Sequence, residues 1–376
     1  MDRPVALFVV GTRPDAIKTA PVVLEFRRHS EVETVLVSTG QHREMLAQAL
    51  DAFGLVPDMD LDVMRHGQTL ASLTGRVMEG LDRHMAERSP TVVLAQGDTT
   101  STFLAGLASF YRQIPFAHIE AGLRTDTVWN PFPEEFNRRA VSLFARLHFP
   151  PTRWAAENLL REGARPADVF VTGNTGIDAV HFVAGKHHKE WFPDHKGRVV
   201  LLTTHRRENW GEPQRQIAEA AARVVERFPD VLLVVPMHRN PDVRETLTAV
   251  LAGKDRVELI EPPDYADFVK LMQRASLILT DSGGVQEEAP SFGVPVLVLR
   301  ETTERPEGVE AGTAKLVGTG LDRIVAESCT LLGDPSAHEA MARAVSPYGD
   351  GKASQRVRSV VFRFLGVPTA EEPMWT

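Results

Sequence analysis

The chain is poor in the features that mark secreted, membrane-spanning and nucleic-acid-binding proteins. It has one cysteine, Cys329, in 376 residues, so no internal disulfide can form and a cytoplasmic location is the simple expectation. No run of 18 apolar residues predicts a transmembrane helix, and no signal peptide is evident before the first apolar segment. The net charge of −8 argues against general nucleic-acid binding, because such proteins usually have basic surfaces. We therefore expect neither a membrane nor a nucleic acid as a partner.

Common metal-ligand spacings are also missing. The sequence contains no His-x-x-x-His, Cys-x-x-Cys or His-Glu-x-x-His pattern, and a metal site needs two or three ligands at such fixed spacing. We expect no metal ion and predict no other cofactor. His205 and His238 each follow a predicted strand in an arginine-rich loop, a placement that favours ligand binding or proton handling over metal binding.

What the chain does contain is a regular alternation of short apolar segments and amphipathic stretches. Buried strands are predicted at 5–10, 32–39, 91–95, 116–119, 147–149 and 169–172, and again at 199–203, 231–236, 257–260, 277–279 and 294–299. Helical spacing separates most of them. Such alternation is typical of parallel sheets covered by helices, so the predicted fold class is α/β with two Rossmann-like domains.

A change in amino-acid composition at 173–198 suggests where the two domains meet. Gly173-Asn174-Thr175-Gly176 is followed by a polar segment with Pro193 and Gly197, a composition typical of a crossover. We predict a first domain at 1–172 and a second at 173–352. A C-terminal helix, within about 353–376, is expected to pack back on the first domain.

The most informative stretch is 277–305, which is typical of a βαβ unit. Its first strand ends in Asp281-Ser282-Gly283-Gly284. Glycines allow a ligand close to the backbone, and the helix start, which Asp281 or Ser282 is expected to cap, suits a phosphate. A tight turn that needs glycine for geometry alone is the alternative. Glu287, Glu288 and Arg305 favour a binding site, since carboxylates accept from sugar hydroxyls and Arg305 follows the next strand end.

Three carboxylates come after strand ends in the first half of the chain. Asp98 and Glu120 follow the third and fourth strands, and Glu134 begins a helix after a proline-stiffened loop. Asp98 could instead cap a helix, and Glu134 and Glu135 could merely complement a helix dipole. Proton transfer needs carboxyl groups in different environments close together, so the set predicts acid–base chemistry. For Arg13 and Lys18 two interpretations stay open: the side chains face a bound anion, or they are ordinary surface cations.

Six segments match one family together and in the same order. They are 11–14 (Gly-Thr-Arg-Pro), 97–101 (Gly-Asp-Thr-Thr-Ser), 118–124 (His-Ile-Glu-Ala-Gly-Leu-Arg), 131–135 (Pro-Phe-Pro-Glu-Glu), 204–208 (Thr-His-Arg-Arg-Glu) and 281–305. From Arg13 to about Gly318 the chain resembles the non-hydrolysing UDP-N-acetylglucosamine 2-epimerases. The resemblance implies a glycosyltransferase-B-like fold with the active site in the interdomain cleft, and a homodimer.

The activity that the resemblance implies is interconversion of UDP-N-acetylglucosamine and UDP-N-acetylmannosamine, which supplies a precursor for surface polysaccharide. UDP leaves, 2-acetamidoglucal forms, and UDP adds back with a proton on the other face. The implied catalytic residues are Asp98, Glu120, Glu134 and His205. The implied substrate-binding residues are Arg13, Lys18, Phe268, Ser282, Gly283, Gly284, Glu288 and Arg305, with Glu288 at the ribose and Phe268 near the uracil.

Some members bind a second UDP-N-acetylglucosamine as an activator. Residues that fit this allosteric site by resemblance are Gln41, His42, Glu134, Arg206 and His238. The chain departs from activator-dependent members at Glu44, where they tend to have Gln, and at Gly67, where they tend to have Arg. An added negative charge and a missing cation weaken binding of a diphosphate, so we predict weak or absent activation. Asp126 also stands where many members have Gly.

Three other functions stay open at this point. A hydrolysing relative would release free N-acetylmannosamine and UDP, although the chain has no appended sugar kinase domain. A glycosyltransferase of the same fold would need an acceptor. A sugar-nucleotide-binding protein without turnover would have little use for three convergent carboxylates.

Overall fold

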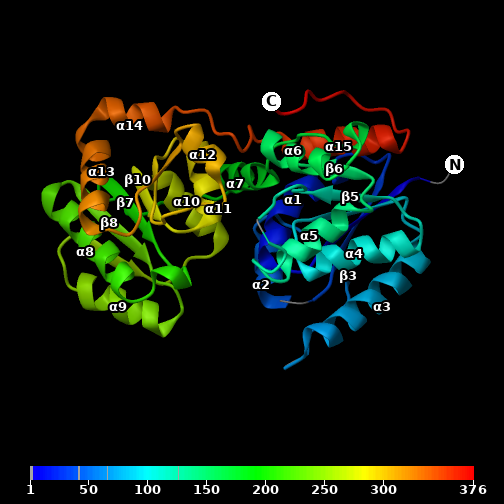
Figure 1. Cartoon of the computed structure of the whole chain (residues 1–376), viewed down its shortest axis with the longest axis horizontal. Helices are drawn as coiled ribbons and strands as arrows, with labels where there is room; N and C mark the ends of the chain where they lie inside the picture. Colours follow the sequence, from blue (N-terminus) through cyan, green and yellow to red (C-terminus); the bar gives the residue numbers. More distant parts are fainter. Residues whose placement is uncertain (1–2, 41–42, 66, 126) are drawn as a thin grey trace. The chain divides into compact units, whose positions relative to one another are not determined.

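The computed structural model describes residues 3–40, 43–65, 67–125 and 127–376. Backbone contacts divide the chain into two compact units (Figure 1). The first unit comprises Met1–Phe182 and Tyr348–Thr376, and the second comprises Val183–Pro347. The division falls inside one helix, α7 (Thr175–Lys186).

The first unit is built on a six-stranded parallel sheet in the order β3-β2-β1-β4-β5-β6. The strands are β1 (Val5–Val10), β2 (Glu33–Ser38), β3 (Met59–Asp60), β4 (Val92–Gln96), β5 (Phe116–Ile119) and β6 (Leu147–Phe149). The helices are α1 (Arg13–Arg27), α2 (Arg43–Asp51), α3 (Leu70–Arg88), α4 (Thr100–Tyr111), α5 (Glu134–Ser142), α6 (Arg153–Arg161), the start of α7, and α15 (Ala353–Phe364).

The second unit repeats this architecture, with the strand order β12-β11-β10-β7-β8-β9. The strands, all paired in parallel, are β7 (Arg198–Thr203), β8 (Val231–Pro236), β9 (Val257–Ile260), β10 (Leu277–Thr280), β11 (Val296–Val298) and β12 (Ala314–Leu316). The helices are α8 (Glu212–Arg227), α9 (Pro241–Leu251), α10 (Tyr265–Arg274), α11 (Gly283–Glu288), α12 (Pro306–Glu310), α13 (Leu321–Gly333) and α14 (Pro335–Ala342). Numbered from its own first strand, each sheet has the 3-2-1-4-5-6 order of the doubly wound nucleotide-binding fold, which confirms the predicted fold class.

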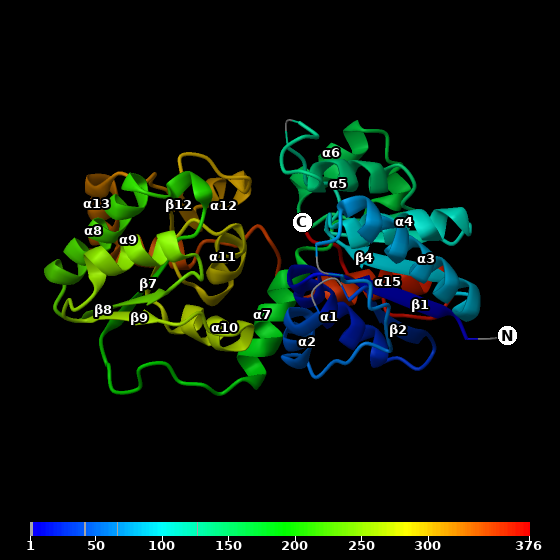
Figure 2. The same cartoon turned by 90° about the horizontal axis from the view of Figure 1, so that it is seen from below.

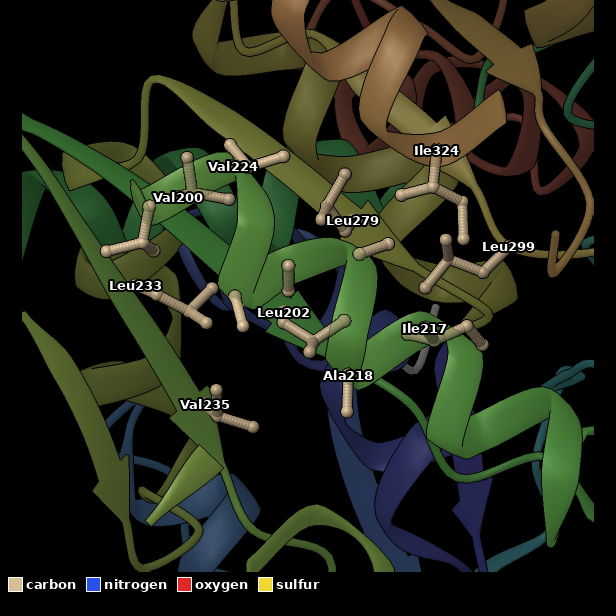
Figure 3. Packing of buried hydrophobic residues seen from close by; sticks show 14 of the residues in the cluster. Val200, Leu202, Ile217, Ala218, Val224, Leu233, Val235, Leu279, Leu299 and Ile324 are labelled. Atoms are coloured by element: carbon tan, nitrogen blue, oxygen red, sulfur yellow. The ribbon is translucent and has the colours of Figure 1, made fainter. Parts of the chain in front are cut away.

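Hydrophobic periodicity explains how these layers pack. In the second unit the inward face of α8, with Ile217 and Ala218, covers Leu202 and Leu233 of the sheet (Figure 3). All four of these side chains are buried. A strand buried on both faces is apolar throughout, which is why β7 and β8 were readable as continuous apolar runs.

The C-terminal helix α15 belongs to the first unit, although the whole second unit, Val183–Pro347, separates it in sequence from residues 1–182. It lies beside α1 in both views (Figures 1 and 2). Phe362 of α15 packs edge-on against Phe26 of α1 with ring centroids 5.3 Å apart, and Arg358 Nε donates to Glu25 Oε1 at 3.0 Å. An apolar contact and a buried ion pair therefore join the two ends of the chain.

Four short segments differ from the sequence-based expectations. The expected strand at 169–172 is wrong, because only an isolated bridge joins Val169 to His148. β3 and β12 were not predicted, because each is short and includes a charged residue, so neither reads as a buried apolar run. The strand expected at 294–299 is shorter in the structure, Val296–Val298. Differences of one or two residues at each end are usual between a sequence pattern and a strand defined by hydrogen bonds.

Candidate active site

Five predicted site residues line one pocket of the first unit. Its volume is about 530 Å³, and its lining includes Arg13, Lys18, Asp98, Glu120 and Glu134. The pocket lies where β1, β4 and β5 end and where α1 and α5 begin. The carboxyl ends of parallel strands meet at one edge of a sheet, so segments that are far apart in sequence converge there.

Two of these carboxylates lie against cations. Lys18 Nζ forms an ion pair with Glu120, and both side chains are largely buried. Arg138 forms one with Asp98. Glu120 also has a backbone φ of 61°, a left-handed conformation that is uncommon for a residue other than glycine and that often occurs at functional sites.

The structure decides against Asp98 as a helix cap. The residue that caps α4 is Thr99, whose hydroxyl accepts from Thr102 N at 3.2 Å. The Asp98 carboxylate is instead directed to Arg138, and its backbone carbonyl accepts from Asn137 Nδ2 at 2.9 Å. Asp98 is thus held by α5, the helix that begins with Glu134.

Asp15 is a pocket residue that the sequence analysis missed. Its carboxylate is 2 % exposed and accepts from Gly11 N at 3.0 Å and Thr12 N at 2.8 Å. Burial raises the pKa of this carboxyl, while the hydrogen bonds from Thr12 and Gly11 oppose the rise. Asp15 fixes the turn that presents Arg13, and Thr12-x-x-Asp15 has the spacing of a capping box, a signal that was available in the sequence.

In the second unit, the loop after β7 is organised by Asp281. Its fully buried carboxylate accepts from the backbone N–H groups of His205 at 3.0 Å and Arg206 at 3.0 Å. It also accepts from Thr204 Oγ1 at 2.9 Å and Asn209 Nδ2 at 3.0 Å. Burial alone would raise the pKa of Asp281, but the contacts with His205 and the loop lower it.

Asp281 and Ser282 therefore do not cap the following helix as expected. Ser282 occupies the N-cap position of α11 without a side-chain cap hydrogen bond, and the Asp281 carboxylate serves the other loop. His205 Nδ1 lies 3.1 Å from Asp281 Oδ1. The ring of His238 stacks on that of His205, with centroids 5.7 Å apart. Partial burial and the neighbouring His205 lower the pKa of His238.

Gly283 is explained by Arg305. A Cβ built on Gly283 would lie 2.8 Å from Arg305 Cζ, so any larger residue would displace the guanidinium from its place beside this turn. Arg305 Nε donates to Glu287 Oε1 at 2.7 Å, and Glu287 is 5 % exposed. Glu287, a candidate for sugar hydroxyls in the sequence analysis, is thus an anchor for Arg305. Glu288 ends α11 near Gly284.

Three arginines surround the carboxylate of Glu304, next to these residues. It pairs with Arg300 at 2.7 Å and lies 3.7 Å from Arg206 and 3.6 Å from Arg305. Burial opposes ionisation, but the hydrogen bond from Arg300 and the surrounding arginines lower the pKa of Glu304 to about 2. Arg206, predicted for the activator, and Arg305, predicted for the substrate, therefore share one counter-ion that the sequence analysis did not single out.

The remaining predicted residues are scattered or undescribed. Phe268 lies on α10 and is partly buried. Gln41 and His42 lie outside the described residues, as does Asp126. Within the described ranges no group of three His, Cys, Asp or Glu side chains could hold a metal ion.

Known proteins resemble this chain over almost its whole length. The sequence profile of the family described as UDP-N-acetylglucosamine 2-epimerase matches residues 24–361. The chain belongs to this family. A member from Bacillus subtilis (strain 168), named UDP-N-acetylglucosamine 2-epimerase, is 50% identical over 351 residues, which cover 93% of this chain and 92% of that protein.

Solved structures of family members have the same fold. A putative UDP-N-acetylglucosamine 2-epimerase from Listeria monocytogenes superposes with a TM-score of 0.93 at 47% identity, covering 99% of this chain and 100% of that one. The Neisseria meningitidis UDP-GlcNAc 2-epimerase, solved bound to UDP-GlcNAc, gives 0.86 at 43% identity, with 96% and 100% covered. The glycosyltransferase of kitacinnamycin shares only the fold, at 14% identity and a TM-score of 0.64. The expected family and glycosyltransferase-B-like architecture are confirmed.

No helix in the described part of the chain combines the length and the apolar character that a membrane crossing requires.

Proposed function

We propose that this chain interconverts UDP-N-acetylglucosamine and UDP-N-acetylmannosamine by inverting C2 of the sugar. The observation that carries the proposal is the pocket in which Asp98, Glu120 and Glu134 converge with two cations. Membership of the family supports the choice of substrate. So do the names of its relatives, one of which was solved with UDP-GlcNAc bound.

Chemistry explains why such a pocket suits the reaction. The C2 proton has no neighbouring carbonyl and is not acidic, so the C1–O bond to UDP must break first or at the same time. The bonding electrons leave with UDP, a carboxylate takes the C2 proton, and the C1–C2 double bond of 2-acetamidoglucal forms. In the reverse sense UDP adds to C1 while a carboxyl on the opposite face gives C2 a proton. The three carboxylates that line the pocket supply candidates for both roles.

The leaving group needs positive charge. Charge develops on the departing diphosphate, and fixed cations and N–H groups stabilise it. We assign this role to Arg305 with the Ser282–Gly284 backbone in the second unit, and to Arg13 in the first. His205 lies on the same loop as Arg206 and is a proton donor to the departing phosphate oxygen. Glu288 and Phe268 are assigned to the ribose and the uracil.

Incubation with UDP-N-acetylglucosamine in deuterated water tests the function. The expected result is both UDP-sugars, each with deuterium at C2, which NMR detects. Free N-acetylmannosamine as the main product would favour a hydrolysing enzyme. Recovery of unlabelled substrate, with UDP binding intact, would favour a binding protein and contradict our proposal.

We further propose that the two units act as the two domains expected from the sequence, and that the enzyme works in the cytoplasm as a homodimer. An apolar face at the ends of α4 and α5 supports self-association. Phe110, Tyr111 and Leu143 are 56%, 66% and 87% exposed there. Phe110 packs against Phe144 at 5.6 Å, so the face is continuous between the two helices. Exposed apolar patches of this kind commonly mark protein interfaces.

A further inference from the structure

Glu135 is a fully buried carboxylate beside the pocket that the proposed mechanism does not use. It is 0% exposed and is not among the pocket-lining residues. Its oxygens pair with Arg139 at 2.6 Å and with Arg138 at 3.0 Å. Burying a carboxylate costs several kcal/mol unless partners compensate, so these two arginines make its position possible.

Arg138 connects Glu135 to the pocket. Its guanidinium pairs with Glu135 on one side and with Asp98 on the other, and its side chain is 12% exposed. A long arginine side chain has many rotamers, and a second carboxylate at fixed distance restricts them. The orientation of the Asp98 carboxylate is thus tied to a group that never contacts the pocket.

Hydrogen bonds also hold the backbone around Asp98. Asn137, on the same helix, donates to the Asp98 carbonyl at 2.9 Å. His118 Nε2 lies 2.7 Å from the carbonyl of Gly97, and a carbonyl only accepts, so Nε2 carries the proton. Burial lowers the pKa of His118 to about 3, which keeps the ring neutral. With the turn held in this way, the Asp98 side chain is the part left for Arg138 to orient.

We propose that Glu135 is a positioning residue, whose buried carboxylate fixes Arg138 so that Arg138 holds Asp98 in the orientation that proton transfer at C2 requires. The inference rests on the function proposed above. Glu135 in the first turn of α5 also complements the helix dipole, but that role needs no particular contact with Arg138. The two roles therefore predict different effects of replacing Glu135 in a protein whose Arg138 is also replaced.

A double-mutant cycle separates them. In Glu135→Gln the side chain keeps its size but loses its charge, and kcat for epimerisation is expected to fall about tenfold to a hundredfold, the scale on which a misplaced catalytic group acts. The KM is expected to stay within about threefold, because Glu135 does not contact the substrate. In an Arg138→Met background, Glu135→Gln should lower kcat by less than about a further twofold, because residues in one network are not additive.

Glu25→Gln is the matched control. Glu25 is also a buried carboxylate of the first unit, and it pairs with two arginines, Arg28 at 2.8 Å and Arg358 at 3.0 Å. It does not line the pocket. This variant should lower the unfolding temperature with kcat of the folded protein unchanged. If Glu135→Gln does not fold, Glu135→Asp replaces it. The shorter side chain keeps the charge but moves the carboxylate away from Arg138, so an intermediate loss of kcat is expected.

Two results would overturn the proposal: a Glu135→Gln enzyme with wild-type kcat, or full additivity with Arg138→Met. Both require an active wild-type enzyme. Failure of the proposed function itself is different, because the wild type would then incorporate no deuterium at C2.

Discussion

His205 Nδ1 lies 3.1 Å from Asp281 Oδ1, and the same carboxylate accepts the backbone N–H of His205. One buried acid thus holds both the ring and the backbone of a proposed catalytic residue. With Nδ1 held by this carboxylate, Nε2 is the ring nitrogen that is left to contact a ligand. The loop that carries His205 is therefore oriented by the residue that precedes the turn we assign to the diphosphate.

Replacement of Asp281 by Asn should loosen this loop. The amide keeps the shape but loses the charge and offers donors where the loop needs acceptors. Buried donors left without partners cost about 1–3 kcal/mol each, so the unfolding temperature should fall and the KM for the UDP-sugar should rise. Thermal unfolding and initial rates measure the two effects.

Asp230→Asn is the control for that substitution. Asp230 is a half-exposed acid of the same unit that pairs with Arg198 at 2.6 Å, and surface pairs contribute about 0–1 kcal/mol. A loss of stability in Asp230→Asn equal to that in Asp281→Asn would contradict the anchoring role of Asp281.

Amide replacement of the pocket carboxylates should separate catalysis from nucleotide binding. Asp98→Asn, Glu120→Gln and Glu134→Gln each remove a proton acceptor, and general acid–base groups contribute about a hundredfold or more. The UDP affinity should stay within about threefold, because none of these three carboxylates is assigned to the nucleotide. Turnover assays and calorimetry with UDP test this, and a variant that keeps wild-type turnover would remove that carboxylate from the mechanism.

The strands and the convergence of the carboxylates were accessible from sequence because both follow from one regularity. In a parallel sheet the residues after strands meet at one edge, so Asp98 after β4 and Glu120 after β5 were expected to lie close together. The structure brings these residues to one pocket. Their chemical roles stay predictions.

The supporting contacts were not accessible in the same way. Asp281 looked like a helix cap because a cap is a local pattern, whereas its actual partners lie 72 to 77 residues earlier in the chain. Glu135 looked like part of an acidic helix start, and only the fold shows that it is buried between two arginines. Asp15 alone left a local signal, the capping-box spacing with Thr12.

Two buried histidines should make stability depend on pH. Burial lowers the pKa of His118 to about 3 and that of His148 to about 4, from 6.5. The unfolded chain binds these protons below pH 6.5 and the folded chain does not, so the stabilisation is complete above pH 6.5 and is lost as the pH falls toward 4 and then 3. The slope is at most about 1.4 kcal/mol per pH unit for each histidine.

Thermal unfolding between pH 7.5 and 5 checks this dependence. His148→Gln removes one of the two groups and should flatten the decline, while His188→Gln, at an exposed position, controls for the substitution itself. An unchanged decline in His148→Gln would show that other groups cause it.

Activation by a second UDP-N-acetylglucosamine should be weak or absent. Glu44 and Gly67 replace the Gln and Arg that activator-dependent members tend to have, and Arg206 already lies near the counter-ion Glu304. We expect hyperbolic initial rates in the direction from UDP-N-acetylmannosamine. A rate that vanishes without added UDP-N-acetylglucosamine would contradict this prediction. In that case the double variant Glu44→Gln/Gly67→Arg should have no further effect on the activation.

The exposed face of α4 and α5 gives a test of the proposed homodimer. Leu143 is 87% exposed, and Leu143→Asp would place a charge in the centre of an apolar interface, where an unpaired charge costs several kcal/mol. Sedimentation should show dimers for the wild type and monomers for the variant. Leu160→Asp is the control, because Leu160 is an exposed leucine of α6 in the same unit and should leave the dimer intact. If Leu143→Asp remains a dimer while Leu160→Asp dissociates, the subunits meet at α6 and not at the ends of α4 and α5.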